Sequence, residues 1–410
     1  MSSPGKAQFP LPPLQCGLLS LTLAISLLGA GCKEYRGTVV DAETQRTIAN
    51  ATVYHDGKVA RSDFRGEFSF KHFNPSKPVL ARAAGYRRAW TKPTERGQLK
   101  LELQPLELRG IYLSHKALGL AEVRARVLGW LDGERLNTLV VDIKDEHGRM
   151  TFYNGAPEAG RIGAFGTVRF DDIQAFLRDM HRRNIYVVGR ISVFQDALLA
   201  KHQPQWRPRS KGRGNLFWLD PFRKQVWAYN IAVAREAAAI GFDEIQFDHM
   251  RFPNERELPQ AAYSRRDTDS NRTRHLAAFL ARAGKELLPF NVSVSLRMPD
   301  LAAAGKPGEM AGVPESWRAP VDCLVTRVSG VEDFEAAMKA AGREGKKRLR
   351  VWLECGGQGD LPASRLWLAR TAELINACEA ARIGGWVLDD PSARYDDSLA
   401  VLRELISQIQ

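Results

Sequence analysis

The chain has 410 residues, of which 44% are apolar and 26% are charged. This is ordinary globular composition, and it excludes a fibrous repeat, a disordered tail protein and a polytopic membrane protein. Lysine and arginine number 59 against 47 aspartate and glutamate, a net charge of +12, but these cations are spread along the chain. The five cysteines form no Cys-x-x-Cys pair, which excludes zinc fingers and knuckles.

An uncharged stretch, GLLSLTLAISLLGAG, occupies residues 17–31 and ends directly before Cys32. It is too short to span about 30 Å of hydrocarbon and has the length of a signal-peptide core. The small residues before Cys32 resemble a bacterial lipobox, although Gly29 stands where leucine is usual. The resemblance implies a signal peptide over residues 1–31, a lipid on Cys32, and a membrane-anchored protein of the cell envelope, at the outer membrane or in the periplasm. A plain secretory signal would give a secreted protein instead. Either location, at the membrane or secreted, argues against nucleic acid as a binding partner.

Residues 32–105 are predicted to form a small antiparallel β-sandwich. Short alternating runs such as residues 36–40, 51–54 and 66–70 are separated by turn residues, among them Asp56-Gly57. This region resembles the carboxypeptidase regulatory-like sandwich domain. Such domains are usually structural or adhesive, so no catalytic residue is expected here.

From residue 106 to residue 410, short apolar runs alternate with amphipathic stretches, the pattern of repeated βα units. Eight such units predict an α/β (β/α)8 TIM barrel. A doubly wound sheet would need a glycine-rich turn after its first strand, and residues 112–116 are not one. The expected strands are Gly110–Ser114, Thr138–Ile143, Ile185–Ile191, Glu244–Asp248, Asn291–Leu296, Cys323–Arg327, Leu349–Leu353 and Trp386–Asp389.

The fourth expected strand is unusually polar on one face. Alternation places Glu244, Gln246 and Asp248 together, with Ile245 and Phe247 on the face toward the helices. Polar groups that line a barrel require partners, since each unpaired one costs about 1–3 kcal/mol. An ion-pair network with Arg190 and Lys144 could supply them without chemistry. Asp248 ends the strand, where barrel enzymes carry their active sites, whereas the deeper Glu244 fits a structural role better.

Several motifs carry a family resemblance. They are residues 136–145 (LNTLVVDIKD), 190–196 (RISVFQD), 218–221 (WLDP), 241–248 (GFDEIQFD) and 251–253 (RFP). Together they resemble the glycoside hydrolase-like barrel family DUF4015. The resemblance implies a TIM barrel that acts on glycosidic bonds, with Asp248 as the first catalytic candidate. It implies substrate-binding roles for Asp142, Lys144 and Arg190, and Gln246 shares their polar lining.

The second half of the barrel departs from the family pattern. Its strand ends offer Glu354 and Asp389 as a second carboxylate, and glycoside hydrolysis needs two carboxyl groups. Asp248 with Glu354 is the preferred pair, and Asp389 is the alternative partner. Aromatic residues near the same ends, Trp218, Trp352 and Tyr395, are candidate platforms for sugar stacking.

The expected function is hydrolysis of an envelope or extracellular polysaccharide. The alternative is a catalytically degenerate lipoprotein that binds a glycan, aided by its sandwich domain. No cofactor or metal is expected, because the histidines are scattered and His249 should point away from Asp248. A basic loop at residues 206–214 is either solvated or a clamp for an acidic glycan. Cys323, Cys355 and Cys378 are expected to be unpaired.

Overall fold

The computed structural model describes residues 35–93, 98–133, 136–152, 156–165, 172–210, 217–254, 256–298, 320–355, 365–390, 395, 399–400 and 404. The apolar stretch at residues 17–31 and the expected lipid site Cys32 lie outside the described residues. Within the described part, no helix is both long and apolar enough to cross a bilayer.

The first domain consists of two small sheets that pack on a common core. One sheet has the order β4-β1-β7 and the other has the order β3-β2-β5-β6. Val39 and Leu101 from the first sheet meet Val53 and Val79 from the second in this core. The strands are β1 (Tyr35–Asp41), β2 (Thr52–His55), β3 (Lys58–Arg61), β4 (Glu67–Phe70), β5 (Val79–Arg82), β6 (Ala89–Thr91) and β7 (Gln98–Leu103).

The expected pairing of this domain needs one correction. The pairs β1–β4, β2–β3, β2–β5 and β5–β6 are antiparallel, but β1 and β7 are parallel, from Arg36–Gln98 to Asp41–Leu103. These are the first and last strands of the domain. The chain therefore enters and leaves it in the same direction.

The second domain is a closed barrel of eight parallel strands in the order β10-β11-β12-β13-β14-β15-β8-β9. The predicted fold is confirmed, and each predicted strand bound lies within two residues of the observed one. The strands are β8 (Leu108–Leu113), β9 (Thr138–Lys144), β10 (Tyr186–Ser192), β11 (Glu244–Asp248), β12 (Ser293–Arg297), β13 (Cys323–Arg327), β14 (Leu349–Glu354) and β15 (Gly385–Asp389).

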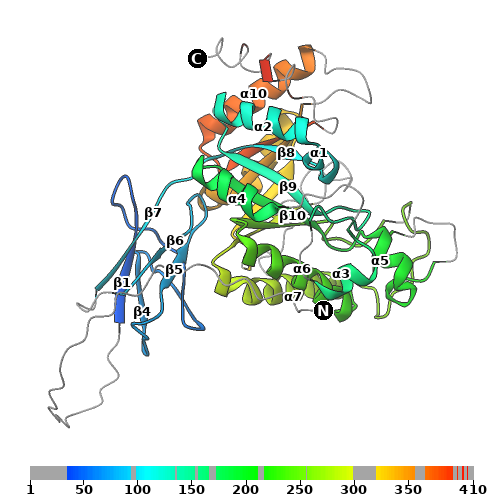
Figure 1. The fold of residues 1–410 in the computed structure, drawn as a ribbon, viewed down its shortest axis with the longest axis horizontal. Helices are drawn as coiled ribbons and strands as arrows, with labels where there is room; N and C mark the ends of the chain where they lie inside the picture. The colour runs from blue at the N-terminus through cyan, green and yellow to red at the C-terminus, as the bar shows by residue number, and fades with distance from the viewer. Residues whose placement is uncertain are drawn as a thin grey trace, which may run out of the picture.

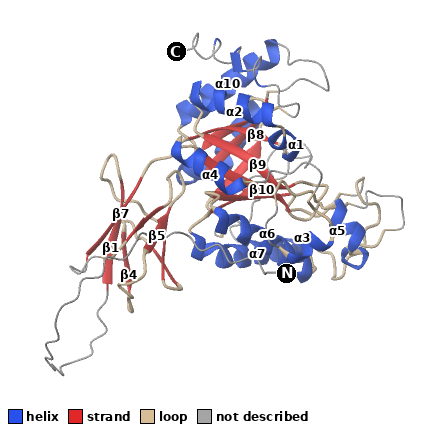
Figure 2. Cartoon of the chain, in the orientation of Figure 1, coloured by secondary structure: helices blue, strands red, loops and turns tan. Residues whose placement is uncertain are grey.

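Helices surround the strands and form the outer layer of the barrel (Figure 2). Phe247 of β11 packs against Phe279 of α7, with ring centroids 5.3 Å apart, as expected for the apolar face of that strand. The helices are α1 (His115–Gly119), α2 (Ala121–Gly133), α3 (Pro157–Arg161), α4 (Ile173–Arg182), α5 (Ala197–His202), α6 (Lys224–Ile240), α7 (Asp269–Leu287), α9 (Val331–Gly345) and α10 (Arg365–Ala381).

The barrel interior is a packed core. Leu108, Val140, Val188, Val325 and Trp352 form one buried cluster inside it. This cluster closes the barrel below the carboxyl ends of the strands, so a substrate can be admitted only at the mouth. Cys323, Cys355 and Cys378 are buried, and no disulfide joins any of them to another described residue, in agreement with the expectation.

The sandwich docks on the opposite end of the barrel, where the strands begin. Arg88 Nη2 lies 3.1 Å from a carboxylate oxygen of Asp243, directly before β11, and Arg82 Nε lies 3.1 Å from Asp322, directly before β13. Asn291, before β12, donates to the carbonyl oxygens of Ala81 and Ala89. In Figure 1 the sandwich accordingly lies on the side of the barrel away from α3 and α5. No described residue of the sandwich lines the mouth cavity, so the expectation that it aids glycan binding there has no structural support.

Candidate active site

A cavity of about 400 Å³ opens at the carboxyl ends of the barrel strands. Its lining includes Glu146 after β9, Arg190 on β10, Asp248 at the end of β11, and Arg297 at the end of β12. This is the position at which TIM-barrel enzymes carry their active sites. Asp248 and Arg190, both predicted site residues, thus meet at one cavity.

The carboxylate of Asp248 accepts hydrogen bonds from several directions. Arg190 Nε lies 2.7 Å and Arg297 Nη1 lies 3.4 Å from Oδ2, and the His249 amide lies 2.6 Å from Oδ1. The guanidinium of Arg190 also binds a second carboxylate, with its Nη1 2.7 Å from Asp142 Oδ1. Asp142 in turn accepts a hydrogen bond from the hydroxyl of Tyr112 at 2.7 Å. One arginine therefore holds two carboxylates at the top of the barrel.

The electrostatic environment favours ionised Asp248. Burial opposes ionisation, but His249, Arg190 and Arg297 together lower the pKa of Asp248 well below its ordinary value. Burial also lowers the pKa of His249, so the two arginines carry the positive charge at neutral pH. For Asp142, burial outweighs Arg190 and Tyr112 and raises the pKa. Asp248 is therefore the more readily ionised of the two carboxyls that share Arg190.

His249 lies on the cavity, contrary to the expectation that it points away from Asp248. Strand β11 ends at Asp248, and His249 has a φ of 51°, in the left-handed region. The alternation of a strand therefore does not continue to this residue. Its Nδ1 lies 3.0 Å from the hydroxyl of Ser192, and its side chain lines the same cavity as Asp248.

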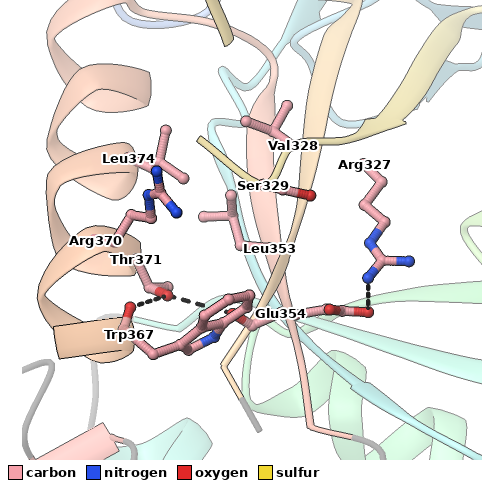
Figure 3. Close-up of a pocket in the computed structure, with 9 residues that line it drawn as sticks. All are labelled: Arg327, Val328, Ser329, Leu353, Glu354, Trp367, Arg370, Thr371 and Leu374. Carbon is pink, nitrogen blue, oxygen red and sulfur yellow. Dashed lines mark hydrogen bonds and ion pairs between the residues drawn. The ribbon is translucent and has the colours of Figure 1, made fainter. Parts of the chain in front are cut away.

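Glu354, the preferred partner of Asp248, is not part of this cavity lining. It forms an ion pair with Arg327, as Figure 3 shows. It lines a separate, smaller pocket with Trp367 and Thr371 of α10. The structure therefore does not bring Asp248 and Glu354 together around one cavity.

Asp389, the alternative partner, lies at the end of β15; it does not line the mouth cavity itself and is linked to it through Trp352 and Arg297. Its Oδ2 accepts a hydrogen bond from Trp352 Nε1 at 2.8 Å, and the guanidinium of Arg297 lies over the Trp352 ring, 4.3 Å from the centroid. Burial raises the pKa of Asp389, with a further contribution from Glu354, against the opposing effects of Trp352, Arg297 and Arg190. Asp248 and Asp389 thus have pKa values shifted in opposite directions, as an acid–base pair requires.

Two of the predicted substrate-binding residues lie below the mouth. The Lys144 side chain is fully buried and its Nζ lies 2.6 Å from Asp196 Oδ2, so it joins neither Asp248 nor Arg190. Gln246 is buried within the barrel on the face that also carries Glu244 and Asp248. Neither side chain lines the mouth cavity. Lys144 lies between its strand and the surrounding helices, beside Asp196 and the Tyr229 ring of α6, and Gln246 lies in the barrel interior.

The three expected sugar-stacking residues are buried. Trp218, Trp352 and Tyr395 are each no more than 1% exposed. Arg251 lies 4.6 Å from the centroid of the Trp218 ring, just as Arg297 lies over Trp352. The hydroxyl of Tyr395 donates to the carbonyl oxygen of Tyr112 at 2.6 Å. The two tryptophans therefore support arginines that line the cavity, and all three aromatic residues lack the exposed face that stacking needs.

Two residues that were not among the predicted catalytic or substrate-binding residues, Glu146 and Arg251, also line the cavity. Glu146 supplies a second carboxylate to its lining, and its Oε2 lies 4.0 Å from Arg190 Nη2. Arg251 is held by Glu257, with both terminal nitrogens 2.6 Å from carboxylate oxygens. Glu146 and Arg251 lie within three residues of the ends of β9 and β11, and this position could have identified them as site residues from the sequence.

Two further expectations concern metal and the basic loop. Among the described residues, no group of three or more His, Cys, Asp and Glu side chains is arranged to hold a metal ion. Lys211 and Arg213 of the expected basic loop lie outside the described residues. Within its described part, Arg209 is exposed and forms a β-bridge with Ala262.

Comparison with known families identifies the barrel. Residues 110–312, which run from β8 to beyond β12, match the family DUF4015, described as "Putative glycosyl hydrolase domain". The DUF4015 region contains Asp142, Arg190, Asp248 and Arg297, and the family assigns the barrel to the hydrolases of glycosidic bonds. No curated protein matches the chain.

Two solved structures with TM-scores of at least 0.50 share this fold. The chain is similar to α-L-fucosidase isoenzyme 2 from Paenibacillus thiaminolyticus, at 14% identity over 74% of this chain and 49% of that one, with a TM-score of 0.51. It is also similar to the PgaB (BpsB) glycoside hydrolase domain from Bordetella bronchiseptica, at 14% identity over 73% and 99%, with a TM-score of 0.50. A hypothetical protein from Ruminiclostridium thermocellum ATCC 27405 is 32% identical over 46% of this chain and 96% of that one, with a TM-score of 0.41.

Proposed function

We propose that this DUF4015 barrel hydrolyses glycosidic bonds of an envelope or extracellular polysaccharide at the cavity lined by Asp248. The observation that carries the proposal is a pair of carboxyl groups at the ends of β11 and β15, on opposite sides of the barrel, whose pKa values are shifted in opposite directions. Arg190 and Arg297 favour the ionised form of Asp248, whereas burial favours the protonated form of Asp389. Glycoside hydrolysis needs one carboxyl group of each kind.

The roles follow from these protonation states. Asp248, ionised, attacks the anomeric carbon or activates the water that does so, and in either case faces the positive charge that develops on the sugar ring. Asp389 gives its proton to the departing glycosidic oxygen. Arg297 lies between them, 3.4 Å from Asp248 and stacked on the tryptophan that binds Asp389. The positive charge of Arg297 favours the ionised form of Asp248 and partly offsets the increase that burial causes in the pKa of Asp389.

The site of action proposed for the enzyme is the cell envelope. The support is in the sequence, where the apolar stretch at residues 17–31 ends in small residues before Cys32. Lipidation of Cys32 would anchor the enzyme to a membrane of the cell envelope, outside the cytoplasm. Substitution of Cys32 with alanine should release the protein from the membrane fraction or leave it uncleaved, and unchanged fractionation would contradict this part of the proposal.

Asp248→Asn tests the hydrolase directly. The change keeps the shape of the side chain and removes its charge, so turnover should fall by about 10³-fold or more while the fold is retained. Release of reducing ends from envelope and exopolysaccharide fractions measures turnover. Asp179→Asn, at a partly exposed position on helix α4 that does not line the cavity, is the matched control and should keep full activity. Cleavage that persists in Asp248→Asn would contradict the assignment, and binding without cleavage by the unmodified protein would favour the glycan-binding alternative.

A further inference from the structure

The two ends of the sandwich domain differ in what they contact and in their charge. One end binds the barrel through Arg82, Arg88 and the strands around them. We call the opposite end the distal end, and define it as Tyr35 at the start of β1, the turn 56–57 with Lys58, the loop 71–78, and residues 92–93. The strand registers place these segments together, since Tyr35 pairs with Phe70 and Val79 pairs with Thr91.

Side-chain contacts join these segments into one surface. The rings of Tyr35 and His55 both stack on Phe73, each with centroids 4.2 Å apart. Lys58 Nζ donates to the carbonyl oxygen of His72 at 3.1 Å, and the Asn74 amide donates to His55 Nε2 at 3.0 Å. The distal end is therefore an ordered part of the domain and can present side chains in fixed positions.

The exposed charge of the distal end is strongly positive. Its described residues include four exposed lysines, Lys58, Lys71, Lys77 and Lys92. Asp56 is the one acidic residue in the described part of this end, and it accepts a hydrogen bond from Asn74 Nδ2 at 3.3 Å. Toward the barrel, the exposed acidic residues Glu43, Asp63 and Glu67 are balanced by the exposed cations Arg46, Arg61 and Arg65, so the excess of positive charge lies at the distal end. This separation of charge along the domain suits a flat anionic surface beyond the distal end.

The chain itself indicates which surface that is. Thirty-four residues precede β1, and the apolar stretch at residues 17–31 ends four positions before Tyr35. An extended chain spans about 3.3–3.6 Å per residue, so Cys32 lies no more than roughly 11 Å of chain from Tyr35. A membrane that holds this segment must therefore face the distal end.

We propose that the distal end of the sandwich docks on a bilayer surface that contains anionic phospholipids. The lysines interact with the phosphate-bearing headgroups, and the contact fixes the orientation of the protein. Because the barrel docks on the other end of the sandwich, its mouth then opens away from the membrane. This inference rests on the membrane attachment proposed above, concerns a surface outside the cavity, and does not depend on the proposed hydrolase activity.

The test compares binding of the full chain to phosphatidylcholine vesicles with and without phosphatidylglycerol. The ratio of the two affinities removes the contribution of the apolar stretch, which is present in both measurements. A basic residue near an anionic surface changes binding by about fivefold, so four lysines should give a preference of about several hundredfold at low salt. The quadruple variant K58Q/K71Q/K77Q/K92Q should lose most of this preference, and high salt should remove it from the unmodified chain.

A matched variant separates the distal end from net charge. R46Q/R65Q/K116Q/K201Q removes four exposed cations elsewhere and should keep the preference for anionic vesicles. Thermal unfolding of both variants establishes that each is folded, and K77E alone supplies a second, milder change at the same surface. An equal loss in the distal and matched variants, or equal affinity of the unmodified chain for both vesicle types, would overturn the proposal.

Discussion

Two acidic residues of strand β11, Glu244 and Asp248, share one face of one strand but occupy different environments. Glu244 lies in the closed interior, where Arg350 Nη1 is 2.5 Å from Oε1 and the Tyr186 hydroxyl is 3.0 Å from Oε2. Asp248 lies at the carboxyl end of the same strand, is bound by Arg190 and Arg297, and lines the mouth cavity. The two carboxylates have the same kind of partner, an arginine from another strand.

The two sites differ in whether a ligand can reach the arginines. The Glu244 side chain is fully buried and Arg350 is almost so, which leaves no path to a ligand. Arg190 and Arg297 instead line a cavity, so their charge can act on a bound molecule as well as on Asp248. A buried ion pair therefore indicates function in this barrel only where it borders the mouth. Deeper in the barrel, the same chemistry serves packing.

The largest effect on stability is expected from breaking the lower ion pair. Arg350→Met should destabilise the protein by about 3–5 kcal/mol, because it leaves the carboxylate of Glu244 buried without its partner. Adding Glu244→Gln should recover much of this loss, since the buried charge is then removed. Denaturant unfolding of the single and double variants measures both values.

Removal of one partner from an exposed pair provides the control. Arg161 and Glu158 form such a pair, and Arg161→Met should cost less than about 1 kcal/mol. If Arg350→Met were no more destabilising than Arg161→Met, the structural role assigned to the lower ion pair would be wrong.

Asp389→Asn should abolish the alkaline limb of the pH profile. Because burial raises the pKa of Asp389, its proton is retained to a higher pH than in an ordinary carboxyl group and is lost as pH rises through the folded value. Activity should therefore fall on the alkaline side, and the asparagine variant should lose about 10²–10⁴-fold of its turnover. Substrates with a good leaving group, which need little protonation, should lose less.

Glu354→Gln distinguishes the two candidate partners of Asp248. Glu354 pairs with Asp389 in the register of β14 and β15, but its side chain binds Arg327 in the separate pocket. The variant should retain most of the activity and the alkaline limb. A larger loss of turnover in Glu354→Gln than in Asp389→Asn would assign the proton donor to Glu354 instead.

A smaller effect is expected when one of the two arginines at Asp248 is removed. His249, Arg190 and Arg297 lower the pKa of Asp248, so Arg297→Met should raise that pKa and move the acid limb of activity to higher pH. The stability that ionised Asp248 contributes is lost as pH falls through its folded pKa, so acid unfolding should also begin at higher pH. Activity and circular dichroism as pH is lowered from neutrality measure the two shifts. An unchanged acid limb would show that Arg190 alone sets the ionisation of Asp248.

The smallest effect is expected at Gln246, which lies between the two acidic residues. It is buried, and its amide nitrogen has no hydrogen-bond partner among the described residues. Gln246→Leu removes a poorly satisfied polar group and should change stability by less than about 1 kcal/mol. Activity should also be preserved, because the side chain does not line the cavity. A large loss of activity with normal stability would restore the original prediction that Gln246 contacts substrate.

The comparison also shows how far sequence reasoning reaches. Alternation along β11 correctly placed Glu244, Gln246 and Asp248 inside the barrel, because a strand fixes the direction of each side chain. It failed one residue later at His249, where the backbone is left-handed and no periodic rule applies. Local periodicity is reliable within an element and carries no information beyond its last residue.

The partners of the site residues were harder to predict because they come from distant strands. Glu354 was a reasonable candidate because it lies at the end of a barrel strand. Its side chain is instead bound by Arg327 of the neighbouring strand, and no pattern within β14 indicates this ion pair. Trp352 was expected to stack on sugar, and instead its ring supports Arg297 of β12. Such contacts depend on side-chain packing across the barrel.

The parallel pairing of β1 and β7 has a mechanical consequence. If the amino end of β1 is held at a surface and the barrel is pulled away, the two strands are drawn past each other along their length. Backbone hydrogen bonds lie across that direction, so the six residue pairs from Arg36–Gln98 to Asp41–Leu103 resist the load together. An antiparallel hairpin pulled from its open end would instead lose its bonds one after another. With the amino-terminal segment anchored as proposed, this pairing would let the domain bear tension between the anchor and the barrel.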